Sequence, residues 1–401
     1  MQETVIAKPY KFVPPHHGTF WPWLFHKYLP LHTRRNWGIE SSEFHGLEHL
    51  QASLTAGTGV LLAPNHCRPC DPFVLGLIGN QLRIPMYAMA SWHLFAGSKV
   101  QRWILRRTGV FSILREGLDR EALKCATQIL VDAKRPLVIF PEGVISRGND
   151  RLGPITDGVS FIARAAAKTR AKAERPGQVV IHPVALRYTF HGDVHQSIEP
   201  VLEMMEKRFG MFALPKLKLA ERIRRLGEVL LSIKEVEYFG AAQAGAHAER
   251  VNRLMDQVLT SLEVRYLSGR NDAAPWARIR KLRTAIRPEL MNGESAEDKA
   301  LRWHHLAECS FALALNFYPP GYIEGETTVE RLLETVERFE EDLIDHSRIH
   351  RPLHCRMDIG EALPVSAERV RGETDPLTGQ LEDRLREMLA ATAHLSHPWK
   401  E

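Results

Sequence analysis

The sequence predicts an α/β fold with a largely parallel sheet flanked by helices, and a mainly helical insertion before the last strand and helix. From about residue 57, short apolar runs bounded by Gly, Pro or polar residues alternate with longer helical patterns. This alternation is typical of a parallel α/β sheet. From about residue 195 to about 346 only long helical patterns occur, and a strand pattern then returns at 353–365. A separate C-terminal helical domain with its own short strand is the competing interpretation.

The individual elements follow in order along the chain. The expected strands are the buried-type runs at 59–64, 84–90, 109–114, 136–140 and 178–186. Helical spacing with polar starts predicts helices at 119–135 and 156–173. We expect four segments: an N-terminal segment at 1–44, an α/β domain at 45–200, a helical insertion at 201–348, and a final strand and helix at 349–401.

Composition sets broad limits on the class of protein. The chain has 401 residues, of which 44% are hydrophobic and 25% charged, as in ordinary globular proteins. A net charge of +5 suits anionic lipids or substrates but is too small to indicate a nucleic-acid partner. Five cysteines without a regular spacing favour a reducing compartment. We therefore expect a cytoplasmic protein without a signal peptide or transmembrane helix.

The segment from Thr19 to Leu31, "TFWPWLFHKYLPL", is rich in aromatic residues and contains a lysine. Such a mixture suits the interface of a membrane, and it equally suits a segment packed on a core. The sequence leaves both interpretations open.

The stretch "APNHCRPCDPFVLG" follows the first predicted strand and contains His66 and Asp71. Asp71 precedes a proline, so it is a good helix N-cap. A tight turn would also bring its carboxylate to the His66 ring. A histidine whose tautomer is fixed by a carboxylate can accept a proton from a hydroxyl group, so this pair suits a general base.

Two further strand ends carry charged residues. "FPEGVISRG" places Glu142 and Gly143 directly after the run at 136–140, with Arg147 close behind. Arg115 follows the run at 109–114. Carboxylates, exposed amides and arginines can hold a polar group that carries both a hydroxyl and a phosphate. Taken singly, a Pro-Glu-Gly loop is more often just a turn, and Arg115 alone would more often be an ordinary surface arginine.

Cys67 and Cys70 have the spacing of a metal or redox pair, with His66 beside them. A structural zinc site needs four ligands, and only His304-His305 and His354-Cys355 offer loose further candidates. We therefore expect no metal site, and we interpret the cysteines as small side chains that fill the turn.

Taken together, these residues resemble the four motif blocks of the glycerolipid acyltransferases, which include the lysophosphatidic acid acyltransferases. The blocks are Asn65-His66 with Asp71, the run from Gly109 to Arg115, Phe140-Pro141-Glu142-Gly143, and Ile181-His182-Pro183-Val184-Ala185. The resemblance covers about residues 45–190 and, more loosely, the final strand and helix. It does not cover the helical insertion.

The resemblance implies transfer of an acyl group from a thioester on coenzyme A or acyl carrier protein to a hydroxyl of a lipid precursor. It implies that His66 is the base, that Asp71 orients it, and that Arg115, Glu142 and Gly143 bind the acceptor. We add Arg147 as an expected acceptor ligand. The resemblance implies no cofactor, a membrane surface as partner, and peripheral membrane location.

Two departures from the family pattern put the acceptor in doubt. Val144-Ile145-Ser146 stands where the family commonly has Thr-Arg-Ser, so the arginine comes later in the loop. Thr156-Asp157 replaces a common basic residue before Gly158. A non-catalytic lipid-binding relative of the same fold is the alternative function.

The helical insertion contains a basic amphipathic stretch at 275–288, a second basic stretch at 216–230, and an acidic amphipathic one at 327–346. The basic stretches could bind anionic lipid, or the helices could pack together. Membrane docking, a cover for the acyl chain and a partner surface all remain open for this block.

Overall fold

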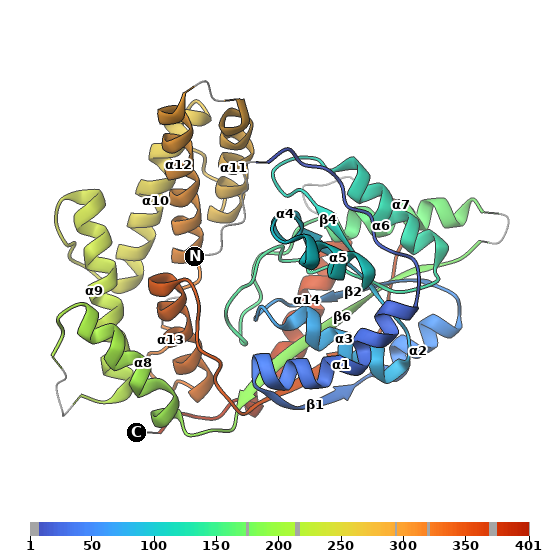
Figure 1. Cartoon of the computed structure of the whole chain (residues 1–401), viewed down its shortest axis with the longest axis horizontal. Helices are drawn as coiled ribbons and strands as arrows, with labels where there is room; N and C mark the ends of the chain where they lie inside the picture. Colours follow the sequence, from blue (N-terminus) through green and yellow to red (C-terminus); the bar gives the residue numbers. More distant parts are fainter. Residues whose placement is uncertain are drawn as a thin grey trace. The chain divides into compact units, whose positions relative to one another are not determined.

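The computed structural model describes residues 8–173, 176–212, 217–292, 295–318, 321–368 and 375–400. The chain forms two compact units, which we describe separately (Figure 1). The first, the α/β unit, comprises Tyr10–His191 and Ile349–Leu395. The second, the helical unit, comprises Gly192–Arg348 and residues at both ends of the chain.

The α/β unit is built on one eight-stranded sheet with the order β1-β7-β6-β2-β5-β3-β4, and β8 pairs with β6 beside this path. Strands β6, β2, β5, β3 and β4 are mutually parallel, β7 is antiparallel to β6, and β1 is parallel to β7. The strands are β1 (Ile39–His45), β2 (Gly59–Pro64), β3 (Tyr87–Ser91), β4 (Val110–Ile113), β5 (Leu137–Val138), β6 (Val179–Phe190), β7 (Leu353–Ile359) and β8 (Leu363–Pro364).

Helices surround this sheet. They are α1 (Phe20–Trp37), α2 (Leu47–Thr55), α3 (Asp71–Leu82), α4 (His93–Ala96), α5 (Lys99–Arg107), α6 (Arg120–Asp132), α7 (Gly158–Ala171) and α14 (Pro376–Ala391), followed by the short 3₁₀ helix η1 (Ala393–Leu395). Helices α6, α7 and α14 share one hydrophobic core with the strands. Leu61, Leu137 and Ile181 lie in this core with no exposed surface, and each fully buried side chain of this kind contributes about 2 kcal/mol.

The predicted fold class is confirmed, including the parallel strands and the return of the chain to the sheet near its end. Because β7 pairs with β6 and β1 of the same sheet, the interpretation of residues 353–365 as part of a separate C-terminal domain is wrong. The strand β1 was not predicted. Its sequence, IESSEFH, is mostly polar and partly exposed, so it lacks the apolar run typical of a buried strand.

The helical unit contains α8 (Val194–Arg208), α9 (Leu219–Phe239), α10 (His247–Tyr266), α11 (Pro275–Asn292), α12 (Ala296–Leu315) and α13 (Val329–Ile344). Helix α11 packs against α10 and α12, and α13 packs against α8 and α9. The apolar side of the basic helix α11 is buried, since Ile279, Leu282 and Ile286 have no exposed surface. That side therefore packs within the unit. Among the described helices of both units, none has the length and apolar character needed to cross a bilayer.

Candidate active site

The candidate site lies at one edge of the sheet. Strands β2, β5, β3 and β4 are adjacent and parallel, so the residues that follow each of them meet at the same edge. His66 follows β2, Glu142 follows β5, His93 follows β3 and Arg115 follows β4. Three of these four residues were predicted from the sequence, whereas His93 was not.

His66 and Asp71 form a buried pair. Nδ1 of His66 lies 2.8 Å from Oδ2 of Asp71, and the two side chains are 12% and 0% exposed. An ionised carboxylate can only accept a hydrogen bond, so Nδ1 carries the proton and Nε2 presents its lone pair. The His66 ring also stacks on Phe140, with ring centroids 3.9 Å apart. Carboxylate and aromatic ring together fix the orientation of the imidazole.

Asp71 receives further hydrogen bonds on both oxygens. The Tyr188 hydroxyl donates to Oδ1 at 2.6 Å, and the backbone N–H of Arg68 donates to Oδ2 at 2.9 Å. Helix α3 begins at Asp71, with Cys70 at the N-cap position and no side-chain cap. The prediction that Asp71 caps this helix is therefore wrong, because its carboxylate points to His66, Tyr188 and the preceding turn.

Glu142 connects the ends of two strands. Its Oε1 accepts the backbone N–H of His66 at 2.6 Å, and its Oε2 accepts that of Gly153 at 2.6 Å. The residue is 1% exposed, and burial raises the pKa of its carboxyl to about 8, against the two amide hydrogen bonds that oppose the rise. Glu142 thus holds the backbone on which His66 sits. Its contact with an acceptor stays a prediction.

The loop after Glu142 also contacts His66. The backbone N–H and the hydroxyl of Ser146 both donate to the His66 carbonyl oxygen, at 2.7 and 3.1 Å. Gly143 and Arg147 adopt left-handed backbone conformations, with φ of 71° and 61°. This conformation is easy for glycine and uncommon for arginine, so the loop is tightly specified around the position of the predicted acceptor ligands.

Arg115 lies near His93 at the ends of β4 and β3. Burial and the Arg115 guanidinium lower the pKa of His93 to about 4, and Nδ1 of His93 lies 2.9 Å from the Ser91 hydroxyl oxygen. His93 is therefore neutral at physiological pH. Of His93 and Arg115, only Arg115 carries a positive charge.

With this geometry in place, comparison with known families identifies the α/β unit. Residues 41–187 match the family model described as Acyltransferase. The chain contains an acyltransferase domain. The matched residues lie wholly within the α/β unit and include His66, Asp71, Arg115, Glu142 and Arg147. No curated protein matches the chain.

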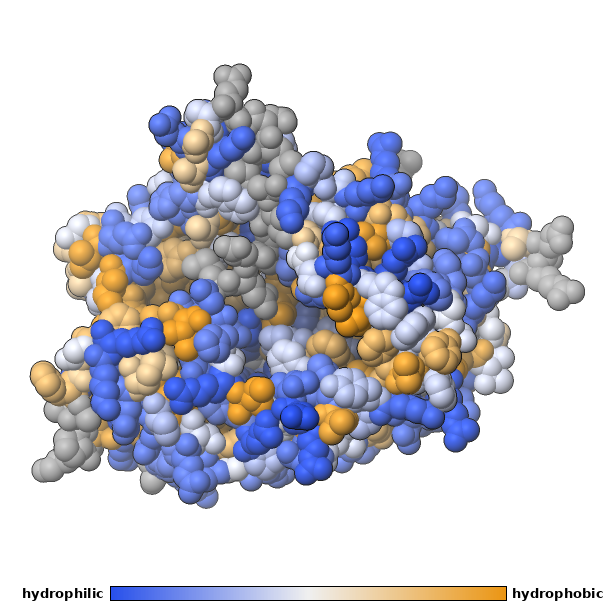
Figure 2. Space-filling model, in the orientation of Figure 1, coloured by the Kyte–Doolittle hydropathy of each residue, from blue (hydrophilic) through white to orange (hydrophobic). Residues whose placement is uncertain are grey.

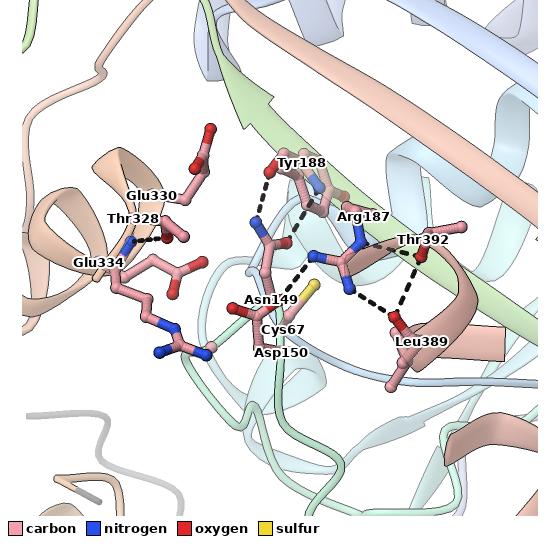
Figure 3. A network of polar contacts seen from close by, with 12 residues as sticks. Cys67, Asn149, Asp150, Arg187, Tyr188, Thr328, Glu330, Glu334, Leu389 and Thr392 are labelled. Atoms are coloured by element: carbon pink, nitrogen blue, oxygen red, sulfur yellow. Dashed lines mark hydrogen bonds and ion pairs between the residues drawn. The ribbon is translucent and has the colours of Figure 1, made fainter. Parts of the chain in front are cut away.

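A polar network of the acyltransferase domain surrounds Arg187 and Tyr188 (Figure 3), and the Tyr188 hydroxyl bonds to Asp71. Asn149 accepts the Tyr188 backbone N–H at 3.0 Å and donates to the Tyr188 carbonyl oxygen. Arg187 is 2% exposed, forms an ion pair with Asp150 at 2.6 Å, and donates to Thr392 and to the Leu389 carbonyl oxygen. The network joins β6 to the Glu142 loop and to the end of α14, so it fixes the place of the Tyr188 hydroxyl.

Cys67 and Cys70 of the acyltransferase domain are buried in the turn between His66 and Asp71. Both side chains are thiols outside any disulfide, and burial raises the pKa of Cys70 to about 12. A protonated thiol is a poor metal ligand and a poor nucleophile. Within the ranges that the structure describes, no three His, Cys, Asp or Glu side chains are arranged to hold a metal ion, so the alternative site at Cys67 and Cys70 finds no support there.

Proposed function

We propose that this acyltransferase moves a fatty acyl group from a thioester donor to a hydroxyl of a lysophospholipid or glycerol-phosphate-type acceptor. The observation that carries the proposal is the His66–Asp71 pair, in which a fully buried carboxylate fixes the tautomer of a partly exposed imidazole. A pair of this kind activates a hydroxyl group that the substrate supplies. The acyl donor is coenzyme A or acyl carrier protein.

In the proposed reaction, Nε2 of His66 takes the proton of the acceptor hydroxyl as its oxygen attacks the thioester carbonyl carbon. The new C–O bond forms, the C–S bond breaks, and the departing thiolate takes the proton from His66. Asp71 stabilises the imidazolium that exists between these two proton transfers. The hydrogen bonds to Asp71 from Tyr188 and Arg68 hold its carboxylate in place.

The acceptor's anionic part would lie against Arg115 and the loop of Gly143 and Arg147. Arg115 follows β4, which β3 separates from β5, at the same edge of the sheet, and an arginine suits bidentate recognition of a phosphate. We propose that Glu142 supports acceptor binding through the backbone, since its two oxygens already accept the amides of His66 and Gly153.

We also propose that the acyltransferase domain binds the cytoplasmic surface of a membrane peripherally. Helices α1 and α5 are joined by an edge-to-face contact between Trp21 and Trp103, with ring centroids 4.8 Å apart. Trp23 and Trp103 are 52% and 42% exposed, and α5 ends with Arg106 and Arg107. Exposed aromatic rings beside cationic side chains suit the interface of an anionic bilayer.

The function is tested with acyl-CoA or acyl-ACP and a panel of lysophospholipids, with the product identified by mass spectrometry. We expect acyl transfer by the parent protein and none by His66→Ala, with folding of the variant checked by circular dichroism. Turnover retained in His66→Ala would disprove the mechanism. A parent protein that binds lysophospholipid without turnover would favour the non-catalytic alternative.

A further inference from the structure

The helical unit contains an apolar cavity of about 380 Å³ among helices α9, α10, α12 and α13. This volume lies within the range of about 300–1,000 Å³ that is usual for small-molecule sites. Its walls are made mainly by aliphatic and aromatic side chains, such as Leu230, Leu231, Phe311, Leu315 and Phe339. Figure 2 shows hydrophobic side chains gathered over α9 on the face in view. Among the residues of α9, Ile233 and Val236 are 45% and 51% exposed.

Most polar side chains of the cavity wall already bond to protein partners. The Tyr318 hydroxyl donates to Asp342 at 2.6 Å, and Nδ1 of His247 lies 2.5 Å from Oε1 of Glu228. Lys234 pairs with the surface residue Glu237 at 2.7 Å. Because these groups are satisfied, they offer little to a polar ligand, and the remaining wall favours an apolar one.

Arg338 is a buried cation in this wall. It is 5% exposed, lines the cavity, and lies over the rings of Tyr318 and Tyr322, at 5.1 and 5.2 Å from their centroids. Its Nε donates to the Glu334 carbonyl oxygen, and among the described residues no carboxylate forms an ion pair with it. A buried guanidinium flanked by aromatic rings can meet the carboxylate or thioester end of an otherwise apolar molecule.

Gly227 contributes to the hollow. It lies within α9, where glycine is a poor helix former, and a Cβ there would be 3.2 Å from Cζ of Phe339. Because Gly227 has no side chain, the space beside the Phe339 ring stays open and forms part of the cavity.

We propose that this cavity binds a long fatty acyl chain, with its carboxyl or thioester end toward Arg338. The choice of an acyl chain rests on the proposed function, because an enzyme that consumes acyl thioesters meets such chains. The existence of the cavity does not depend on the proposed function, because all of its lining residues belong to the helical unit. The chain could come from a free fatty acid or from the thioester donor.

The test is photo-crosslinking of the full-length protein with diazirine-labelled palmitate and, separately, with its coenzyme A thioester. Mass spectrometry then locates the labelled peptides. We expect label on peptides from α9, α12 and α13, removed by excess unlabelled palmitate. Labelling by the free acid alone, by the thioester alone or by both supports the cavity as an acyl site and identifies the source. Label confined to residues 10–191 would overturn the proposal.

Two variants of the cavity wall sharpen this test. Ala314→Phe puts a ring into the cavity, and we expect roughly tenfold less labelling there, since the ring occupies space that the acyl chain would fill. Ala307→Phe is the matched control, because Ala307 is exposed on the same helix outside the cavity wall. Should Ala314→Phe unfold, Gly227→Ala improves helix propensity and is expected to displace Phe339 and reduce labelling. Unchanged labelling in a folded Ala314→Phe or Gly227→Ala would also overturn the proposal.

The same labelling of His66→Ala separates this inference from the proposed function. Label in the helical unit with no acyl transfer supports the cavity and the base together. Transfer retained in His66→Ala, with the label still in α9, α12 and α13, would disprove the mechanism while leaving the cavity proposal standing.

Discussion

The Tyr188 hydroxyl donates a 2.6 Å hydrogen bond to Oδ1 of Asp71, whose other oxygen faces His66. Tyr188 comes from β6 and is fully buried, so its hydroxyl has a fixed position. The arrangement adds a third side chain to the His66–Asp71 pair, so that Tyr188, Asp71 and His66 are connected by successive hydrogen bonds. Tyr188 is a positioning residue that acts on the substrate only through Asp71 and His66.

We predict that Tyr188→Phe lowers kcat/KM by roughly tenfold, since a hydrogen bond to a charged group contributes about 1.5–3 kcal/mol. Without the donor, the Asp71 carboxylate is held less firmly against His66, so kcat should fall while the acceptor KM changes little. Steady-state kinetics measure both effects. Tyr238→Phe, in the helical unit, is the matched control. A Tyr188→Phe protein with the kcat of the parent would show that the tyrosine only fills space.

Glu142→Gln should destabilise the acyltransferase domain by about 1–3 kcal/mol, because one backbone N–H, of His66 or of Gly153, would then face an amide NH₂. The displaced backbone should also lower kcat more than it changes acceptor KM. Urea unfolding and steady-state kinetics measure these two effects.

Glu121→Gln provides the comparison for Glu142→Gln, since Glu121 is exposed on α6. This control should alter stability by less than about 0.5 kcal/mol. A Glu142→Gln protein with parent stability and a raised acceptor KM alone would instead indicate direct contact of Glu142 with the acceptor.

The stability of the α/β unit should depend on pH through His93. Its pKa is lowered from an ordinary value of 6.5 to about 4 in the folded chain, so between these values the unfolded chain binds more protons. The free energy of unfolding therefore falls as the pH drops from 6.5 towards 4, by at most about 3 kcal/mol from this residue.

His93→Gln should remove this part of the pH dependence, because glutamine can still bond to the Ser91 hydroxyl and does not titrate. Urea unfolding of both proteins at pH 7.5, 6 and 5 gives the difference. Parallel curves for parent and variant would contradict the prediction.

Membrane binding should depend on the exposed rings of α1 and α5. Replacing both Trp23 and Trp103 by alanine should weaken binding to vesicles of mixed neutral and anionic phospholipid by roughly tenfold, because each exposed indole loses apolar contact area. Sedimentation of the protein with vesicles at low and high salt measures this. Phe161→Ala, at an aromatic residue 52% exposed on α7, is the control and should bind as the parent does.

Much of the fold was predictable from the sequence because the parallel strands are buried on both faces. Strand β2 is the clearest case: its six residues are all buried, and its apolar run begins and ends where the strand does. His66 and Asp71 were predictable as a pair for a different reason. Only five positions separate them, so a single turn suffices to join them.

What the sequence did not indicate depends on contacts between distant segments. The predicted strand at 178–186 ends before Arg187, a polar residue that bounds the apolar run. The strand in fact continues to Phe190, because Asp150 and Thr392 satisfy the buried guanidinium. Tyr188 lies beyond that false end, and its contact with Asp71 joins residues 117 positions apart. The spacing of residues within a short segment cannot predict such a contact.

The junction between the sheet and the helical unit has a consequence for engineering. Phe190 and Leu353 are directly paired on β6 and β7, and the N–H of His191 bonds to the carbonyl oxygen of Pro352 at 3.0 Å. The chain thus departs and re-enters through the open end of what would otherwise be a β-hairpin. In an engineered chain, a two-residue Asn-Gly turn would replace residues 192–351 and connect β6 directly to β7. The shortened chain would form its β6–β7 ladder from near neighbours, which should speed folding by lowering the contact order.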